Sequence, residues 1–176
     1  MIVDMLVPLF CLPDPGASLA SLACIGIQVR RARTREEEAL VSWVAKNFSR
    51  AWASECRVAM SRMPPACFVA LQEDELVGFA CFEASHKGFF GPMGVLEKHR
   101  MKGIGKALAL CALKAMAETG YEYGIIGEVG PVEFYEKVLH ATVIPCSVNR
   151  LGASKRIQGQ AVQSSDRLQI KGIGED

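Results

Sequence analysis

A short basic segment around two glycines has the residue types and spacing to hold an anion. Gly103 and Gly105 stand one residue apart, where an amphipathic helix is predicted to begin at Ile104. The first backbone N–H groups of a helix have no intrahelical partner and lie at the positive end of its dipole, and glycine lets a phosphate come close to them. The segment therefore predicts a phosphate-binding loop, and it carries four basic side chains: Lys98, Arg100, Lys102 and Lys106.

Three phosphate-binding patterns can be compared with this segment. A Walker loop requires Gly five residues before its Gly-Lys pair and Ser or Thr after it, where this chain has Arg100 and Ala107. The dinucleotide pattern G-x-G-x-x-G requires a small residue where Leu108 stands, and it normally follows the first strand of a parallel sheet. The third pattern, Arg/Gln-x-x-Gly-x-Gly/Ala, is matched at every defined position from Arg100 to Gly105. The segment favours this third pattern.

With this loop, a predicted strand before it, a helix after it and a later Phe-Tyr-Glu-Lys segment at 134–137, the sequence resembles the GNAT-type N-acetyltransferases. The resemblance covers roughly residues 25–147. It implies that the loop binds the pyrophosphate of acetyl-coenzyme A, and that an irregular strand before the loop offers backbone groups to the cofactor's amides. The cofactor-binding residues that it implies are Met93, Gly94, Val95, Arg100, Met101, Lys102, Gly103, Ile104, Gly105, Lys106 and Ala107.

Acetyl transfer from a thioester to an amine also needs a base for the amine and a proton donor for the departing thiolate. Because an alkyl amine has a reference pKa of about 10.4, a base must take its proton near neutral pH. Glu128 is the first candidate for the base, Glu83 is the second, and deprotonation relayed by water stays open. The resemblance implies that Tyr135 donates a proton to the leaving thiolate.

The elements that would position these residues follow from the apolar periods of two and 3.6 along the chain. A short helix is expected before the resemblance begins, at 14–24. The order from residue 25 onward is strand, two helices, three antiparallel strands, helix, strand, helix, strand, which is similar to the GNAT fold. This predicts an α/β (α+β) class with a mixed, mostly antiparallel sheet of six or seven strands flanked by helices, in which the fourth and fifth strands are splayed. The expected strands are 25–33, 66–71, 76–82, 89–95, 123–129 and 141–146, and the expected helices lie at 34–63, 104–118 and 130–140.

The chain is expected to hold one domain. Residues 1–24 are interpreted as an N-terminal extension, 25–147 as the GNAT-like domain, and 148–176 as a polar tail that is disordered or adds a weak final strand. No convincing candidate exists for the final strand of the family, and that strand usually contributes to the far wall of the acceptor pocket.

Composition limits the classes of partner. The formal net charge of +1 gives no argument for nucleic acid or an anionic membrane. The apolar run at 5–12 lacks a basic leader and is interrupted by Pro8, so we expect neither a signal peptide nor a membrane span. The seven cysteines, without any Cys-x-x-Cys pair, are expected to be reduced and buried in a cytoplasmic protein without a metal. Trp43 and Trp52 are expected in the core, and the three histidines at the surface. The resemblance leaves a second role open for Trp52, in the lining of the acceptor site.

The leading prediction is an acetyl-coenzyme A dependent N-acetyltransferase that acts on a primary amine of a small molecule or amino-acid-like acceptor by direct transfer. The alternative is a non-catalytic acyl-coenzyme A binding or regulatory module with an incomplete acceptor site. A third and weaker alternative is a nucleotide-binding fold. The identity of the acceptor and the oligomeric state, with a homodimer among the options, are not encoded in any recognisable pattern.

Overall fold

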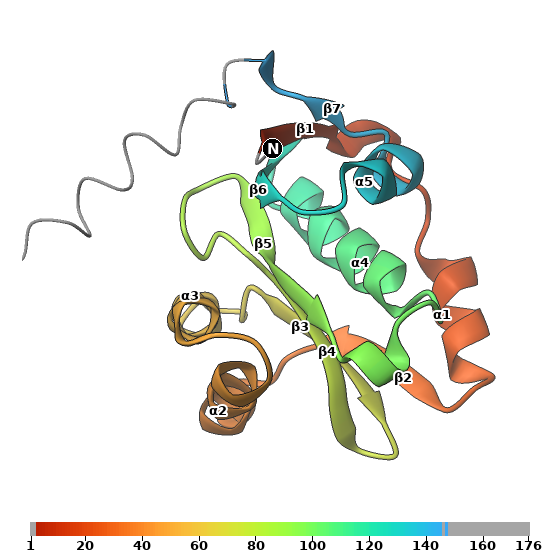
Figure 1. Cartoon of the computed structure of the whole chain (residues 1–176), viewed down its shortest axis with the longest axis vertical. Helices are drawn as coiled ribbons and strands as arrows, with labels where there is room; N and C mark the ends of the chain where they lie inside the picture. The colour runs from red at the N-terminus through yellow and green to blue at the C-terminus, as the bar shows by residue number, and fades with distance from the viewer. Residues whose placement is uncertain (1–2, 146, 148–176) are drawn as a thin grey trace, which may run out of the picture.

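A seven-stranded mixed sheet forms the centre of the computed structural model, which describes residues 3–145 and 147 (Figure 1). The strand order is β2-β3-β4-β5-β6-β1-β7, and the pairing of β5 with β6 is parallel while the other pairings are antiparallel. This confirms the predicted class and the predicted mixed sheet. The strands are β1 Val3–Pro8, β2 Ile27–Arg31, β3 Cys67–Gln72, β4 Glu75–Phe82, β5 Phe89–Val95, β6 Tyr123–Val129 and β7 Thr142–Val143.

The helices cover both faces of the sheet. α2 and α3 pack against one face, α4 and α1 lie on the other, and α5 lies beside the end of β6 (Figure 1). The core lies between these layers, and α4 contributes a continuous row of buried residues to it. The helices are α1 Gly16–Ala23, α2 Glu37–Asn47, α3 Arg50–Met60, α4 Ile104–Glu118 and α5 Val132–Leu139, with 3-10 turns at Leu9–Cys11, Thr34–Glu36 and Glu97–His99.

The N-terminal strand β1 completes the sheet. Residues 1–24 were expected to lie outside the domain, but Val3–Pro8 lies between β6 and β7 and pairs antiparallel with both. The far side of the sheet is thus formed by β1 from the N-terminal part of the chain together with the short strand β7. The division of the chain into three segments stays a prediction, and the weak strand predicted within 148–176 lies outside the described residues. The last predicted strand, at 141–146, is much shorter, since β7 spans two residues.

The two parallel neighbours β5 and β6 separate soon after they meet. Their pairing consists of Phe89 with Ile125 and Phe90 with Ile126, and the remaining residues of β5 have no partner in β6. A shift in the β4–β5 register between Ala80 and Phe82, opposite the Gly91-Pro92 pair, marks an irregularity where the separation begins. The predicted splay of the fourth and fifth strands of the domain is therefore present. Within residues 3–145 and 147, no helix has the length and apolar character to cross a membrane.

One ion pair near the start of α2 allows a test of the fold by pH. Arg30 donates to both carboxylate oxygens of Glu36 at 2.6 and 2.9 Å, and these hydrogen bonds lower the pKa of Glu36 to about 2. Because the folded-state pKa lies below the ordinary value of 4.5, this stabilisation is present above pH 4.5 and is lost as the pH falls toward 2.

We therefore expect Glu36→Gln to lower the free energy of unfolding by about 1 kcal/mol at pH 7, with a smaller difference at pH 3, in urea denaturation. Glu37→Gln is the matched control, because Glu37 and its partner Arg57 are both more exposed than this pair. An equal loss for Glu36→Gln at both pH values would contradict the assignment.

Candidate functional site

The start of α4 has the geometry of an anion-binding loop. Gly103 is the N-cap residue of α4 with φ 86°, a left-handed conformation that favours glycine, and no side chain caps this end of the helix. A Cβ atom built on Gly103 would meet nothing within 4 Å, so the space in front of the helix is open. The first backbone N–H groups of α4 therefore face a free volume that suits an anion.

The eight predicted loop residues differ in their exposure to solvent. Ile104 and Ala107 are buried, so they can offer an anion only their backbone N–H groups. The exposed group adds positive charge at the same place, although the Arg100 side chain donates from Nε to the Val95 carbonyl at 3.3 Å. The exposed members are Arg100, Met101, Lys102, Gly103 and Lys106, while Gly105 is half-buried.

The free edge of β5 offers its backbone at alternate residues. Leu96 N–H donates to the Val77 carbonyl on β4 at 2.9 Å. Backbone groups alternate between the two edges of a strand, so Gly94 also faces β4, while Met93 and Val95 face the gap toward β6. Gly94 is glycine for another reason: a Cβ atom there would lie 2.5 Å from the Phe48 ring. Of the three residues predicted to bind the cofactor's amides, Met93 and Val95 have backbone groups on the gap side, and the Val95 carbonyl there also accepts from Arg100 Nε.

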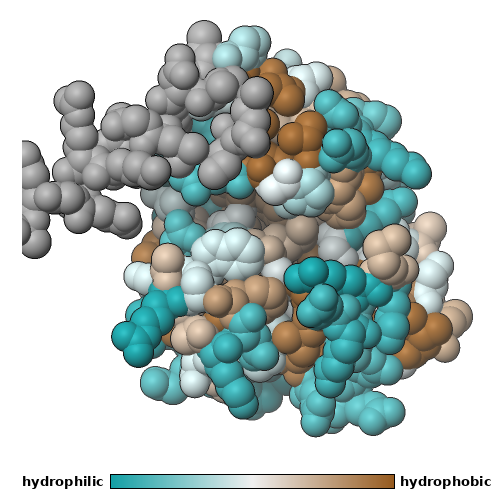
Figure 2. Space-filling view, in the orientation of Figure 1, coloured by the Kyte–Doolittle hydropathy of each residue, from teal (hydrophilic) through white to brown (hydrophobic). Residues whose placement is uncertain are grey.

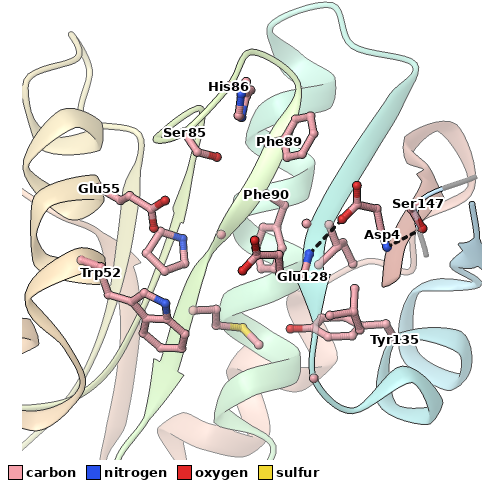
Figure 3. Close-up of a pocket in the computed structure, with 18 of the residues that line it drawn as sticks. Asp4, Trp52, Glu55, Ser85, His86, Phe89, Phe90, Glu128, Tyr135 and Ser147 are labelled. Carbon is pink, nitrogen blue, oxygen red and sulfur yellow. Dashed lines mark hydrogen bonds between the residues drawn. The ribbon is translucent and has the colours of Figure 1, made fainter. Parts of the chain in front are cut away.

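A pocket of about 580 Å³ opens where β5 and β6 meet, on the face of the sheet that carries α3. Figure 3 shows its walls: α3 on one side, the turn before β5 above, and β6 with α5 on the other side. In the space-filling view, the surface is hollowed near its middle, with both hydrophobic and hydrophilic side chains around the hollow (Figure 2). A cavity large enough for a small acceptor therefore lies at the point where β5 and β6 separate.

Glu128 lies at an irregularity of β6 that turns its carboxylate toward this pocket (Figure 3). The β1–β6 register shifts between Val3 and Met5, and Glu128 adopts φ 51°, which is uncommon for a residue with a side chain. The backbone N–H of Glu128 donates to Oδ1 of Asp4 at 3.0 Å, and Asp4 N–H in turn donates to Ser147 Oγ at 2.9 Å. Strained backbone that neighbouring groups hold in place is frequent at functional sites.

Tyr135 projects from α5 into the same pocket. Its ring is buried and contacts Phe134 edge to face, with centroids 5.0 Å apart, while the hydroxyl points into the cavity (Figure 3). Burial raises the pKa of Tyr135 to about 12. The phenol is therefore a weaker acid than free tyrosine, and it stays protonated as a hydrogen-bond donor at every pH of interest.

α3 forms one wall of the pocket, and on this wall Glu55 was not identified from the sequence as a site residue. Trp52, expected in the core, lines the pocket and stacks on Phe48 with centroids 5.6 Å apart. Glu55 lines the pocket beside it, and burial, with the negative charge of Glu128, raises the pKa of the Glu55 carboxyl. His86, expected at the surface, lies on the rim and contacts the Phe89 ring at 5.0 Å.

The charged residues that line the pocket are mostly acidic. Asp4, Glu55 and Glu128 line it, and none of its described lining residues is Lys or Arg. Glu83, the second candidate base, is not among the lining residues: it accepts a hydrogen bond from the Tyr121 hydroxyl and lies 3.7 Å from Arg62. The structure thus brings Glu128 and Tyr135 together at one cavity and places Glu83 elsewhere.

A mixed sheet with two splayed parallel strands, an uncapped helix start and a pocket at the splay define a class of acyltransferase fold. The family model described as "Acetyltransferase (GNAT) family" matches residues 32–140, and the chain belongs to this family. Comparison with curated proteins gives no match.

Solved structures show the same fold at low sequence identity. A GCN5-related glucosamine N-acetyltransferase region of a fungal multi-domain GH3 β-N-acetylglucosaminidase superposes with a TM-score of 0.66 at 18% identity, over 81% of this chain and 20% of that one. For a GCN5-related N-acetyltransferase from Sphaerobacter thermophilus the TM-score is 0.61 at 20% identity, over 81% and 48%. A GNAT family acetyltransferase from Brucella melitensis, in complex with acetyl-CoA, gives 0.50 at 17% identity, over 67% and 86%. The chain thus spans a fifth to a half of the length of the first two of these proteins.

Proposed function

We propose that this chain transfers an acetyl group from acetyl-coenzyme A to a primary amine of a small molecule. The observation that supports this most is the separation of β5 from β6, which has the uncapped start of α4 on one side and the acidic pocket at the point where the strands part. This arrangement suits a cofactor with a diphosphate at one end and a thioester at the other. The thioester would supply the acetyl group, while the chain binds the cofactor, orients the acceptor amine and moves protons.

In this proposal the backbone N–H groups at the start of α4, with Lys102 and Lys106, bind the diphosphate. Arg100 adds its charge beside them. Backbone groups of Met93 and Val95 pair with the amides of the arm in the gap. Met101, Gly103, Gly105 and the buried Ile104 and Ala107 act through their backbone.

Two pocket residues handle protons in the proposed reaction. The Glu128 carboxylate takes a proton from the ammonium form of the acceptor, directly or through one water, so that the neutral amine can attack. The Tyr135 hydroxyl donates a hydrogen bond to the departing sulfur. A phenol with a pKa of about 12 does not transfer its proton fully to a thiolate whose acid has a pKa near 8.5, so its contribution is electrostatic.

The charge of the pocket predicts the class of acceptor. Glu55 and Glu128, with His86 as the basic residue in the described lining, favour an amine that keeps a second positive charge while the first amine reacts, and Trp52 and Phe89 offer aromatic surface to its carbon chain. A charge-assisted hydrogen bond to a second ammonium contributes about 1.5–3 kcal/mol, which corresponds to a factor of about 10 or more.

A thiol-release assay with acetyl-coenzyme A and an amine panel tests this proposal. We expect release with primary amines, and a kcat/KM at least about tenfold higher for diamines than for monoamines of equal length. If the cofactor bound but no amine caused release of the thiol, the alternative of a non-catalytic acyl-coenzyme A binding module would be supported. That alternative was suggested by a missing wall of the acceptor site, and β1 now lies on that side of the sheet.

Replacement of Tyr135 by phenylalanine separates its role in turnover from a role in the core. We expect kcat to fall about tenfold while the Kd for acetyl-coenzyme A stays unchanged, because only one hydrogen bond to the departing sulfur is lost. Isothermal titration with the cofactor and initial rates measure the two quantities. A Tyr135→Phe variant with wild-type kcat would remove Tyr135 from the mechanism.

A homodimer, a cytoplasmic location and the lack of a bound metal stay predictions from the sequence.

A further inference from the structure

Three cysteines that the proposed reaction does not use meet in the core between α3 and the sheet. Cys56 on α3, Cys67 on β3 and Cys81 on β4 are each fully buried, and their sulfur atoms all lie within 4.8 Å of one another. Cys67 and Cys81 stand directly opposite in the antiparallel pair, and the Cys81 thiol donates to the Cys67 sulfur at 3.5 Å. We call this cluster the trithiol core.

The three cysteines of the trithiol core differ from the other described cysteines in that they lie together. Cys11 and Cys24 are exposed and Cys111 is half-buried, so the expectation that the cysteines are buried holds for only some of those described. Sulfur atoms from three separate elements converge on one point. Cysteine sulfur is a soft ligand that binds thiophilic metals and metalloids, so three converging sulfur atoms form a candidate site.

Geometry and charge together select the ligand. Bonds of about 2.3 Å from one centre to three thiolates hold the sulfur atoms about 3.5–4 Å apart. The three sulfur atoms of the trithiol core lie within 4.8 Å of one another, and those of Cys67 and Cys81 are 3.5 Å apart. A buried site without a compensating charge must be nearly neutral, because an unpaired charge in the core is costly. Three thiolates around a monovalent or divalent cation keep a negative charge, whereas three thiolates around a trivalent centre are neutral.

We propose that the trithiol core is a binding site for a trivalent, thiophilic metalloid of the arsenous acid type. The reaction is a condensation: three S–H and three As–O bonds break, three As–S bonds and three water molecules form, and arsenic stays trivalent. No oxidant or reductant takes part. Because the sulfur atoms are buried, α3 must separate locally from the sheet before the ligand enters, and binding is slow.

Occupation of the trithiol core ties α3 to β3 and β4. Trp52 and Glu55 lie on the same helix within the turn before Cys56 and line the acceptor pocket. The bound metalloid thus sits directly behind that wall of the pocket. Binding itself depends on neither the cofactor nor an acceptor, so it is measured without reference to the proposed acetyl transfer.

The test uses the full chain, reduced, with sodium arsenite as the probe and native mass spectrometry as the readout. We expect one arsenic per chain, seen as a gain of one arsenic atom less three hydrogens, with three sulfur neighbours in X-ray absorption. Cys67→Ala should lose this species, while the matched control Cys111→Ala, which removes a thiol outside the cluster, should keep it.

A thermal melt distinguishes the folded site from thiols of the unfolded chain, and it needs no variant. A ligand that binds the folded state raises Tm, and one that prefers the unfolded state lowers it. We expect arsenite to raise Tm. An unchanged or lowered Tm, arsenic bound equally by Cys67→Ala, or binding of Zn²⁺ without binding of arsenite would overturn the proposal.

Discussion

Arg100→Ala combined with Gly103→Glu should weaken the binding of coenzyme A by about 100-fold. The double variant removes one positive charge and adds a negative one at the positive end of α4, and glutamate does not readily adopt φ 86°. Interactions of charges with a helix end contribute up to about 2 kcal/mol each, so two changes together reach about 3 kcal/mol. Isothermal titration with coenzyme A measures the loss.

The opposite end of α4 provides the matched control. Lys114→Ala combined with Gly120→Glu makes the same change in charge, and Gly120 has φ 101° with nothing near its missing Cβ. This control should bind coenzyme A as the wild type does. If both double variants bound equally well, the start of α4 would not be the diphosphate site.

Glu128→Gln should lower kcat at pH 7 by about 100-fold or more, the range that a general base contributes. The irregular turn at Glu128 should persist, because Asp4 accepts from the backbone N–H and not from the carboxylate. Initial rates over a range of pH with a diamine acceptor measure the effect. The Kd for acetyl-coenzyme A should stay unchanged, which would show that the fold of the variant is intact.

Glu55→Gln is the comparison for this second prediction. Glu55 lines the opposite wall, so its loss should raise KM for a diamine more than it lowers kcat. If Glu55→Gln abolished turnover and Glu128→Gln did not, Glu55 would be the base. The raised pKa of Glu55, which brings it closer to neutral pH, is the physical reason to include this comparison.

The sequence predicted those parts of the fold that depend on local signals. α4 spans Ile104–Glu118 and β6 spans Tyr123–Val129, the ranges expected from apolar period and from Gly120. The loop before α4 was recognised because glycine and basic residues at fixed spacing have a local physical meaning. The irregular strand was implied by the family resemblance, and the Gly91-Pro92 pair is a local signal for it, because proline lacks an N–H and glycine permits a kink.

The parts that could not be predicted depend on contacts distant in sequence. β1 pairs with β6 across more than a hundred residues, and no local pattern names that partner. Asp4 in an otherwise apolar strand was the available signal for a buried polar role. Trp52 and Glu55 lie next to residues of the core face of α3, so helical period alone does not separate pocket from core. The convergence of Cys56, Cys67 and Cys81 depends in the same way on how α3 packs on the sheet.

A crystal structure with coenzyme A bound tests the central claim most directly. The account predicts the diphosphate against the backbone N–H groups at the start of α4, and the thiol-bearing arm in the gap between β5 and β6 with its sulfur near Tyr135 and Glu128. A cofactor bound elsewhere, or β5 and β6 paired along their full length in the complex, would contradict it.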